Sequence, residues 1–198
     1  MPKTQEKHLF NRLSAEKQER IMHACIEEFA RAGYINASTN KMAKAAGISK
    51  GSLFKYFSSK KELYVEVIDH ILEDFFGYVQ SKDHYLEEKD ILERLKLVTK
   101  ETYSFFRKKT SLFKVLMRVK TEGKMNVMEQ LKERWEPKVA FFYGRFFSGV
   151  DFSNLALTQE EFIKLWNLID YAIDSEVLSE LNGEFSMDDL EAAYENRL

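Results

Sequence analysis

Apolar residues recur at helical spacing along most of the chain, and no sustained alternation of apolar and polar residues predicts a strand. In the first such stretch, Ile21, Cys25 and Phe29 fall one turn apart on a single stripe. Ser14 has a hydroxyl that can cap this helix, and Gly33 can take the left-handed conformation that ends it. The pattern predicts an all-α fold of about nine helices.

Two short helices are expected next, separated by a glycine. The first is predicted to begin near Ser38 or Thr39 and to stop at Gly47, which allows a sharp bend. The second is predicted to begin at Ser49 and to end near Phe57. Two short helices joined by a turn with glycine, packed on a longer helix, are typical of a helix-turn-helix.

The fourth helix is expected after "SSKKE" (58–62) and should reach about Val79. Pro137 should break or kink a long helix, because proline lacks an N–H and clashes with the preceding turn. Thr158 and Glu161 have the spacing of a capping box. The other expected elements are a polar connection at 81–90 and helices at 91–107, at 112–119, from 125 onward, from 158 and from 186.

Composition limits where the protein works. The 198 residues contain one cysteine, so no disulfide can form within the chain. The polar N-terminus lacks the apolar core of a secretory signal, and no apolar run approaches the ~20 residues of a membrane-spanning helix. We therefore expect a cytoplasmic protein without a membrane partner.

Charge is distributed unevenly along the chain. Residues 1–60 have 11 Lys and Arg against 5 Asp and Glu, a net charge of +6, whereas residues 61–198 have a net charge of −8. This asymmetry predicts two domains with different partners, 1–60 and 61–198. The basic first domain is expected to meet an anionic polymer.

The start of the third helix has the chemistry for such a partner. Lys50 supplies a full charge, and Gly51 has no side chain, so the backbone can approach a base or phosphate. The helix N-terminus adds a partial positive charge and unpaired N–H groups. The apolar pattern leaves six residues toward solvent: Lys50, Gly51, Ser52, Phe54, Lys55 and Tyr56. We expect this end of the helix to press against DNA.

Residues 14–65 resemble the DNA-binding domain of the tetracycline-repressor (TetR) family. The resemblance rests on Phe29, Gly33, Met42-Ala43, Ala46 to Gly51, Leu53-Phe54, Tyr56-Phe57, Lys60 and Leu63. It implies that the third helix enters the major groove, where Lys50, Gly51 and Ser52 read base edges. The DNA-binding residues that it implies are Ser38, Thr39, Asn40, Ser49, Lys50, Gly51, Ser52, Phe54, Lys55, Tyr56 and Lys60.

Within that set, the resemblance implies phosphate contacts by residues 38–40, by Tyr56 and by Lys60. This sequence departs from the family pattern at two positions. Ala37 stands where many relatives have threonine, which leaves capping to Ser38. Phe54 replaces a common tyrosine and lacks the hydroxyl that would contact phosphate there.

Residues 66–198 match no motif, and here the resemblance implies a domain that binds a small-molecule effector. It also implies a homodimer formed by the last two long helices, about 158–181 and 187–198. Aromatic residues and methionines are abundant in this half, which suits a pocket for an apolar ligand, although helical core packing explains many of them. The predicted ligand-binding residues are Phe76, Tyr103, Phe106, Phe113, Met117, Trp135, Phe142, Phe146 and Trp166.

The sequence thus predicts a DNA-binding transcriptional regulator, a repressor that a largely apolar effector releases from operator DNA. One alternative is a helical ligand-binding protein that does not bind DNA. Another is an all-α enzyme, which no nucleophile–base arrangement in the sequence supports. No cofactor and no metal site is predicted.

Overall fold

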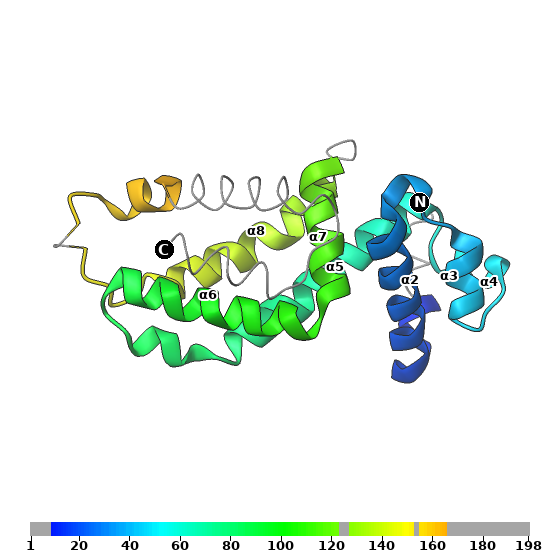
Figure 1. The fold of residues 1–198 in the computed structure, drawn as a ribbon, viewed down its shortest axis with the longest axis horizontal. Coiled ribbons are helices and arrows are strands. Elements are labelled where there is room, and N and C mark those ends of the chain that lie inside the picture. The colour runs from blue at the N-terminus through cyan, green and yellow to red at the C-terminus, as the bar shows by residue number, and fades with distance from the viewer. Residues whose placement is uncertain (1–8, 123–126, 153–154, 166–198) are drawn as a thin grey trace. The chain divides into compact units, whose positions relative to one another are not determined.

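The computed structural model describes residues 9–122, 127–152 and 155–165. All regular structure in these ranges is helical, and no strand occurs among them (Figure 1), which confirms the all-α prediction. The principal helices are α2 (Ala15–Asn36), α3 (Thr39–Ala45), α4 (Lys50–Tyr56), α5 (Lys60–Gln80), α6 (Ile91–Lys108), α7 (Thr110–Glu122) and α8 (Val127–Phe146).

The described residues form two compact units. One contains the chain up to Asp74 together with Ser111–Lys132, and the other contains Phe75–Thr110 together with the chain from Glu133 onward. Helix α5 therefore contributes to both units. The domain boundary expected near residue 60 stays a prediction, because these units are defined by compactness alone.

Most helix boundaries agree with the sequence pattern, and three features differ from it. Helix α2 continues to Asn36 instead of ending at Gly33, where the left-handed φ of 69° kinks it. A 3-10 helix, η1 (Asp83–Glu87), lies within the polar connection that was expected at 81–90. Pro137 lies inside α8 rather than ending it, so the expected break does not occur. Pro137 is exposed, so water can bond the carbonyl that loses its N–H partner.

Serine caps begin both short helices. The Ser38 hydroxyl accepts the N–H of Lys41 at 3.4 Å, and the Ser49 hydroxyl accepts the N–H of Ser52 at 3.0 Å. The expectation for Ser14 is wrong: it is the N-cap residue of α2, but its hydroxyl makes no capping hydrogen bond.

The capping box is confirmed. The Thr158 N–H donates to the Glu161 carboxylate at 2.8 Å, and the Glu161 N–H donates to the Thr158 hydroxyl at 3.3 Å. Residues 159–165 are helical after this cap. The remainder of the expected helix 158–181 and all of 187–198 lie outside the described residues.

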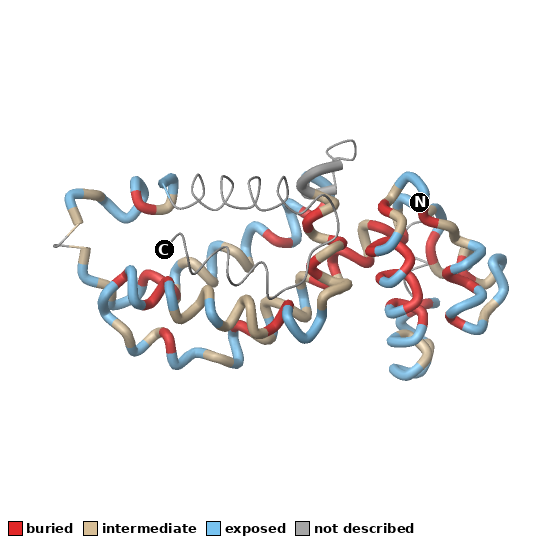
Figure 2. The backbone as a smooth tube through the Cα atoms, in the orientation of Figure 1, coloured by how far each residue is buried: buried red, intermediate tan, exposed pale blue. Residues whose placement is uncertain are grey.

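The core of the first unit follows the stripe read from the sequence. Ile21, Cys25 and Phe29 of α2 are fully buried, as are Met42 of α3 and Leu53 of α4. Figure 2 shows buried residues running along α2. Burial raises the pKa of the Cys25 thiol to about 12, so this thiol stays protonated and unreactive in the folded protein.

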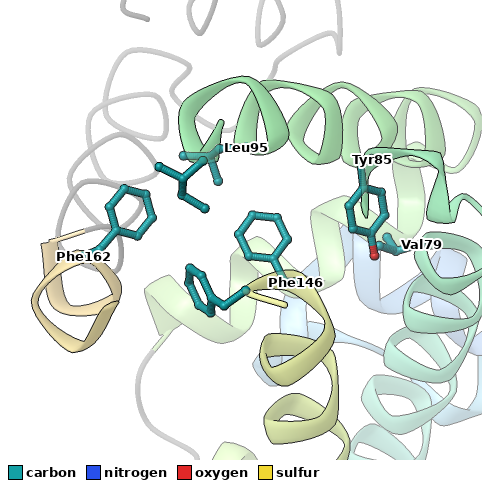
Figure 3. Close-up of a cluster of buried hydrophobic side chains, with 7 residues drawn as sticks. Val79, Tyr85, Leu95, Phe146 and Phe162 are labelled. Carbon is teal, nitrogen blue, oxygen red and sulfur yellow. The ribbon is translucent and has the colours of Figure 1, made fainter. Parts of the chain in front are cut away.

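The second unit has an aromatic core. Figure 3 shows side chains from α5, η1, α6, α8 and the helical turn at 159–165 meeting in this cluster. Its buried members are Val79, Tyr85, Ile91, Leu95, Phe146, Phe147 and Phe162.

Arg94 lies beside this core and is 1% exposed. Its guanidinium donates to the carbonyls of Phe146 at 2.5 Å and Ser148 at 2.9 Å, at the end of α8. It also donates to the carbonyls of Leu86 at 2.8 Å and Glu88 at 2.6 Å, at the end of η1. One buried cation thus satisfies four carbonyls at two helix ends, which fixes the end of α8 to the start of α6.

Candidate nucleic-acid interface

A tight glycine turn joins α3 to α4. Gly47 has a φ of 64°, a left-handed conformation that glycine adopts without steric cost. The N–H of Gly47 donates to the Lys44 carbonyl at 3.1 Å, and the N–H of Ile48 donates to the Ala43 carbonyl at 2.9 Å. These bonds close the turn and direct the chain into α4.

Two side chains of α2 hold the two ends of α3. The Glu28 carboxylate accepts the backbone N–H of Ser38 at 2.9 Å, and the Arg20 Nε donates to the Ala46 carbonyl at 3.1 Å. An anion at the N-terminus and a cation at the C-terminus both complement the helix dipole. Helix α3 is therefore oriented by polar contacts as well as by its buried apolar face.

Glu28 was not among the residues expected from the sequence, although its position on the apolar stripe was a signal. It lies two turns after Ile21, on the apolar stripe of α2, and it is 7% exposed. Burial raises the pKa of this carboxyl, but hydrogen bonds from the Ser38 N–H and from Arg31 outweigh burial and leave the pKa lowered. The Arg31 guanidinium donates to the second carboxylate oxygen at 2.7 and 3.0 Å.

The start of α4 is polar and exposed. The hydroxyls of Ser49 and Ser52 lie 2.9 Å apart, so the side chain that caps α4 also contacts the Ser52 side chain. Lys50 is exposed, and its ammonium lies 5.9 Å from the centre of the Phe54 ring. The aromatic ring at position 54 therefore supports the lysine side chain along the helix surface.

Gly51 is not required by the fold of this chain. A Cβ placed on it would meet only the Ser49 hydroxyl oxygen, at 3.8 Å, which is an ordinary van der Waals contact. Its φ is not in the left-handed region, and glycine within a helix costs about 1 kcal/mol relative to alanine. The missing side chain thus leaves the leading surface of α4 open to a close approach from outside the chain.

The expected DNA-binding residues all lie on the outer part of this unit. The exposed ones are Asn40, Ser49, Lys50, Gly51 and Lys55, and the half-buried ones are Ser38, Thr39, Ser52, Phe54, Tyr56 and Lys60. None of them is fully buried, whereas Leu53 and Phe57 of the same segment are buried and anchor α4. The contact that each residue makes with DNA stays a prediction.

Lys60 has intramolecular partners in addition to its predicted role. Its ammonium donates to the Ile35 carbonyl at 3.1 Å and lies 5.2 Å from the centre of the Tyr34 ring. Burial lowers the pKa of Lys60, and the negative charge of Glu28 partly offsets this effect. Lys60 therefore ties the start of α5 to the last turn of α2.

The expected ligand-binding residues are distributed over both units. Phe76, Trp135, Phe142 and Phe146 are linked by ring contacts in the second unit: Phe76 lies 5.2 Å from Trp135 and 5.8 Å from Phe142, and Phe142 stacks on Phe146 at 6.0 Å. We call these four residues the aromatic group.

The other residues of that prediction are not members of the aromatic group as defined. Phe106 is buried and reaches the aromatic group through Phe75, which stacks on it at 5.2 Å and contacts Phe76 at 5.6 Å. Tyr103 is half-buried on α6. The buried Phe113 and Met117 lie on α7, in the first unit. Trp166 lies outside the described residues.

Neither a metal site nor a membrane-spanning helix is present in the described ranges. Within them, no three His, Cys, Asp or Glu side chains gather so that they could hold a metal ion. No helix in the same ranges is long and apolar enough to cross a bilayer.

Two short helices joined by a glycine turn, the second with an exposed cationic start, define a helix-turn-helix DNA-binding domain. Residues 21–67 match the family model described as bacterial regulatory proteins, tetR family. Residues 21–67 thus have the DNA-binding domain of the tetR family, as the resemblance implied.

Curated relatives are distant. The chain is 25% identical over 138 residues to the nucleoid occlusion factor SlmA of Actinobacillus pleuropneumoniae, a match that covers 69% of this chain and 62% of that protein. It is 25% identical over 150 residues to the uncharacterized HTH-type transcriptional regulator YdgC of Bacillus subtilis, covering 71% and 74%. The chain thus spans less than two thirds of the length of the SlmA protein that it matches.

Solved structures share the fold at low identity. The fatty acid degradation regulator FadR of Bacillus halodurans superposes with a TM-score of 0.65 and 18% identity, over 89% of this chain and 95% of that one. FadR of Bacillus subtilis, solved in complex with stearoyl-CoA, gives a TM-score of 0.63 and 16% identity, over 88% and 96%. These similarities show a shared fold that extends beyond the helix-turn-helix.

Proposed function

We propose that this protein is a sequence-specific DNA-binding transcriptional regulator of the cytoplasm, a repressor that a small apolar effector releases from its operator. The observation that supports DNA binding most directly is the start of α4. There an exposed lysine adjoins a glycine that the chain's own packing does not require.

The proposed DNA contacts are of two kinds, to base edges and to backbone phosphates. Helix α4 enters the major groove, where Lys50 and Ser52 contact base edges and Gly51 allows the backbone to come close. Residues 38–40, Tyr56 and Lys60 contact phosphates. The net charge of +6 on residues 1–60 supplies attraction that weakens as salt rises.

The protein is proposed to act as a homodimer through residues 158–181 and 187–198. A two-fold dimer presents two copies of α4, which must lie about 34–36 Å apart to occupy successive major grooves. Half-sites in the operator should therefore be related by a palindrome with that spacing.

Helix α5 is the proposed connection between effector and DNA. Its first residue, Lys60, contacts the Ile35 carbonyl in the first unit, and Phe76 belongs to the aromatic group of the second unit. Since the helix is continuous between them, an effector that displaces Phe76 can shift the start of α5. Such a shift would change the spacing of the two α4 helices and lower operator affinity.

A long acyl chain is the proposed effector class. The rings of the aromatic group offer apolar contacts, and a relative of the same fold was solved with stearoyl-CoA. Stearoyl-CoA is therefore the first probe. Buried Trp135 gives the readout, because a ligand near Phe76 should quench its fluorescence, and Trp135→Phe should abolish that change while leaving Trp166 as an internal control.

The DNA-binding proposal is tested by gel mobility shift with the full chain and DNA from upstream of its own gene. Lys50→Ala should weaken the specific complex at least tenfold, the loss of a good base contact. Lys96→Ala removes an equally exposed charge from α6 and should leave binding unchanged. DNA binding by Lys50→Ala at full strength would contradict the proposal that Lys50 of α4 contacts base edges.

The same experiments separate the alternatives. A chain that binds stearoyl-CoA but no DNA would be a ligand-binding protein without regulatory contact. Turnover of an added acyl-CoA by the purified chain would instead favour the enzyme. Dissociation of the DNA complex by stearoyl-CoA is the result that the proposed repressor requires.

A further inference from the structure

An aromatic residue ahead of α2 packs on the end of α4. Residues 9–11 form a short helical turn before α2, and Phe10 within it is 7% exposed. The Phe10 ring lies 5.0 Å from the ring of Phe57 and 6.2 Å from that of Tyr56, edge-on to the latter. Tyr56 is the last residue of α4.

Hydrogen bonds from α2 hold the same turn in place. The Gln18 amide donates to the Leu13 carbonyl at 2.9 Å and to the Asn11 carbonyl at 3.3 Å. The Leu13 N–H donates back to the Phe10 carbonyl at 3.0 Å. Phe10 is therefore held by α2 on one side while its ring braces α4 on the other.

Helix α4 depends on tertiary contacts, and Phe10 adds to those of Leu53 and Phe57. It has seven residues, and a helix this short is not stable without tertiary contacts. Leu53 is its one fully buried residue, near its middle, and Tyr56 at its end is half-buried. Phe10 supplies an apolar edge contact to the Tyr56 ring at this end of the helix.

We propose that Phe10 is a positioning residue for DNA binding: it orders the Tyr56 ring before DNA arrives, so that the tyrosine hydroxyl is already directed to a backbone phosphate. This inference rests on the proposed function. Its physical reason is that immobilising a side chain upon binding weakens the complex, and a side chain ordered beforehand avoids that penalty.

A residue that only stabilised the fold would give a different result from one that acts through Tyr56, and a double-mutant cycle distinguishes the two. The affinity of the full chain for its upstream DNA is measured by fluorescence anisotropy for the unmodified protein, Phe10→Ala, Tyr56→Phe and the double variant. Phe10→Ala should weaken binding by about threefold to tenfold, which corresponds to the ordering of one side chain. In the Tyr56→Phe background the same change should have little further effect, since the hydroxyl is already absent.

Two further variants separate positioning from folding. Phe10→Leu keeps an apolar side chain in the same place, so it should retain most of the thermal stability yet still bind DNA less tightly, and it replaces Phe10→Ala in the cycle if the latter unfolds. Asn11→Ala, an exposed neighbour on the same turn, should change neither quantity.

The inference is overturned if Phe10 variants weaken binding equally with and without the Tyr56 hydroxyl, or if they bind as tightly as the unmodified chain. If the unmodified chain binds no DNA, the proposed function and this inference are both contradicted. If it binds DNA and only the coupling to Tyr56 is absent, the proposed function stands and the positioning role does not.

Discussion

The carboxylate of Glu28 accepts the backbone N–H of Ser38 at 2.9 Å, so a buried side chain of α2 holds the residue that caps α3. Arg31 neutralises this carboxylate from the other side at 2.7 Å. Because α3 leads through the glycine turn into α4, this single contact helps to determine the orientation of α4, the helix that we propose contacts DNA bases.

Removal of the Glu28 carboxylate should destabilise the protein. Glu28→Ala leaves the half-buried N–H of Ser38 without its acceptor and removes the ion pair with Arg31, and hydrogen bonds to a charged group contribute about 1.5–3 kcal/mol each. We expect the free energy of unfolding in urea to fall by about 2–3 kcal/mol. Glu27→Ala is the matched control: Glu27 is exposed, its recorded partner is His23 at 4.0 Å, and its loss should have little effect.

Acid should remove the contribution of Glu28. Its folded-state pKa lies below the ordinary value of 4.5, so the stabilisation is complete above the unfolded-state pKa and is lost as pH falls through the folded-state value. Urea unfolding of the wild type and of Glu28→Gln, measured from neutral pH to below 4.5, should show their difference in stability shrinking as pH falls. If the difference in unfolding free energy instead grows in acid, the folded protein does not stabilise the charged form of Glu28.

Gly51 and Gly77 should respond differently to alanine. Neither position has a close neighbour that a Cβ would disturb, and both lie within helices, so each substitution should leave the fold intact and raise stability by up to about 1 kcal/mol. Only Gly51→Ala should weaken binding to upstream DNA, since its new methyl group lies on the proposed contact surface. Equal DNA affinities for the two variants, in melting and anisotropy measurements, would indicate that nothing approaches Gly51.

Arg94 should be essential for the second unit. Arg94→Ala leaves four carbonyls at the ends of η1 and α8 without their donor, and we expect the free energy of unfolding to fall by about 3 kcal/mol or more. Arg94→Lys should restore only part of this loss, because an ammonium cannot span the four acceptors. If Arg94→Ala has the melting temperature of the wild type, water molecules replace the guanidinium as hydrogen-bond donors to these carbonyls.

The features that could be predicted from the sequence are those formed by residues close to one another in the chain. The caps at Ser38 and Ser49, the capping box at Thr158 and the glycine turn at Gly47 were readable, because each depends on groups within a few residues of one another. The buried stripe of α2 was readable because helical periodicity decides which side chains share a face.

The ligand-binding prediction had a weaker basis. Aromatic composition indicates apolar surface but not which helices meet. Phe76, Trp135 and Phe142 lie together in one unit, Phe113 and Met117 belong to the other, and the ligand contacts of all five stay a prediction. Pro137 does not break α8, because exposure allows water to replace the lost hydrogen bond, and the alternative of a kink stays a prediction.

The sequence by itself determined the helices, their caps and the helix-turn-helix, since local propensity and periodicity suffice for those. Only the tertiary structure decided that Glu28 holds Ser38, that Phe10 braces Tyr56 and that Arg94 joins the end of α8. These contacts join residues 10, 46 and 52 positions apart, and no local rule specifies such partners, because they depend on which helix faces come together when the chain buries its apolar surface.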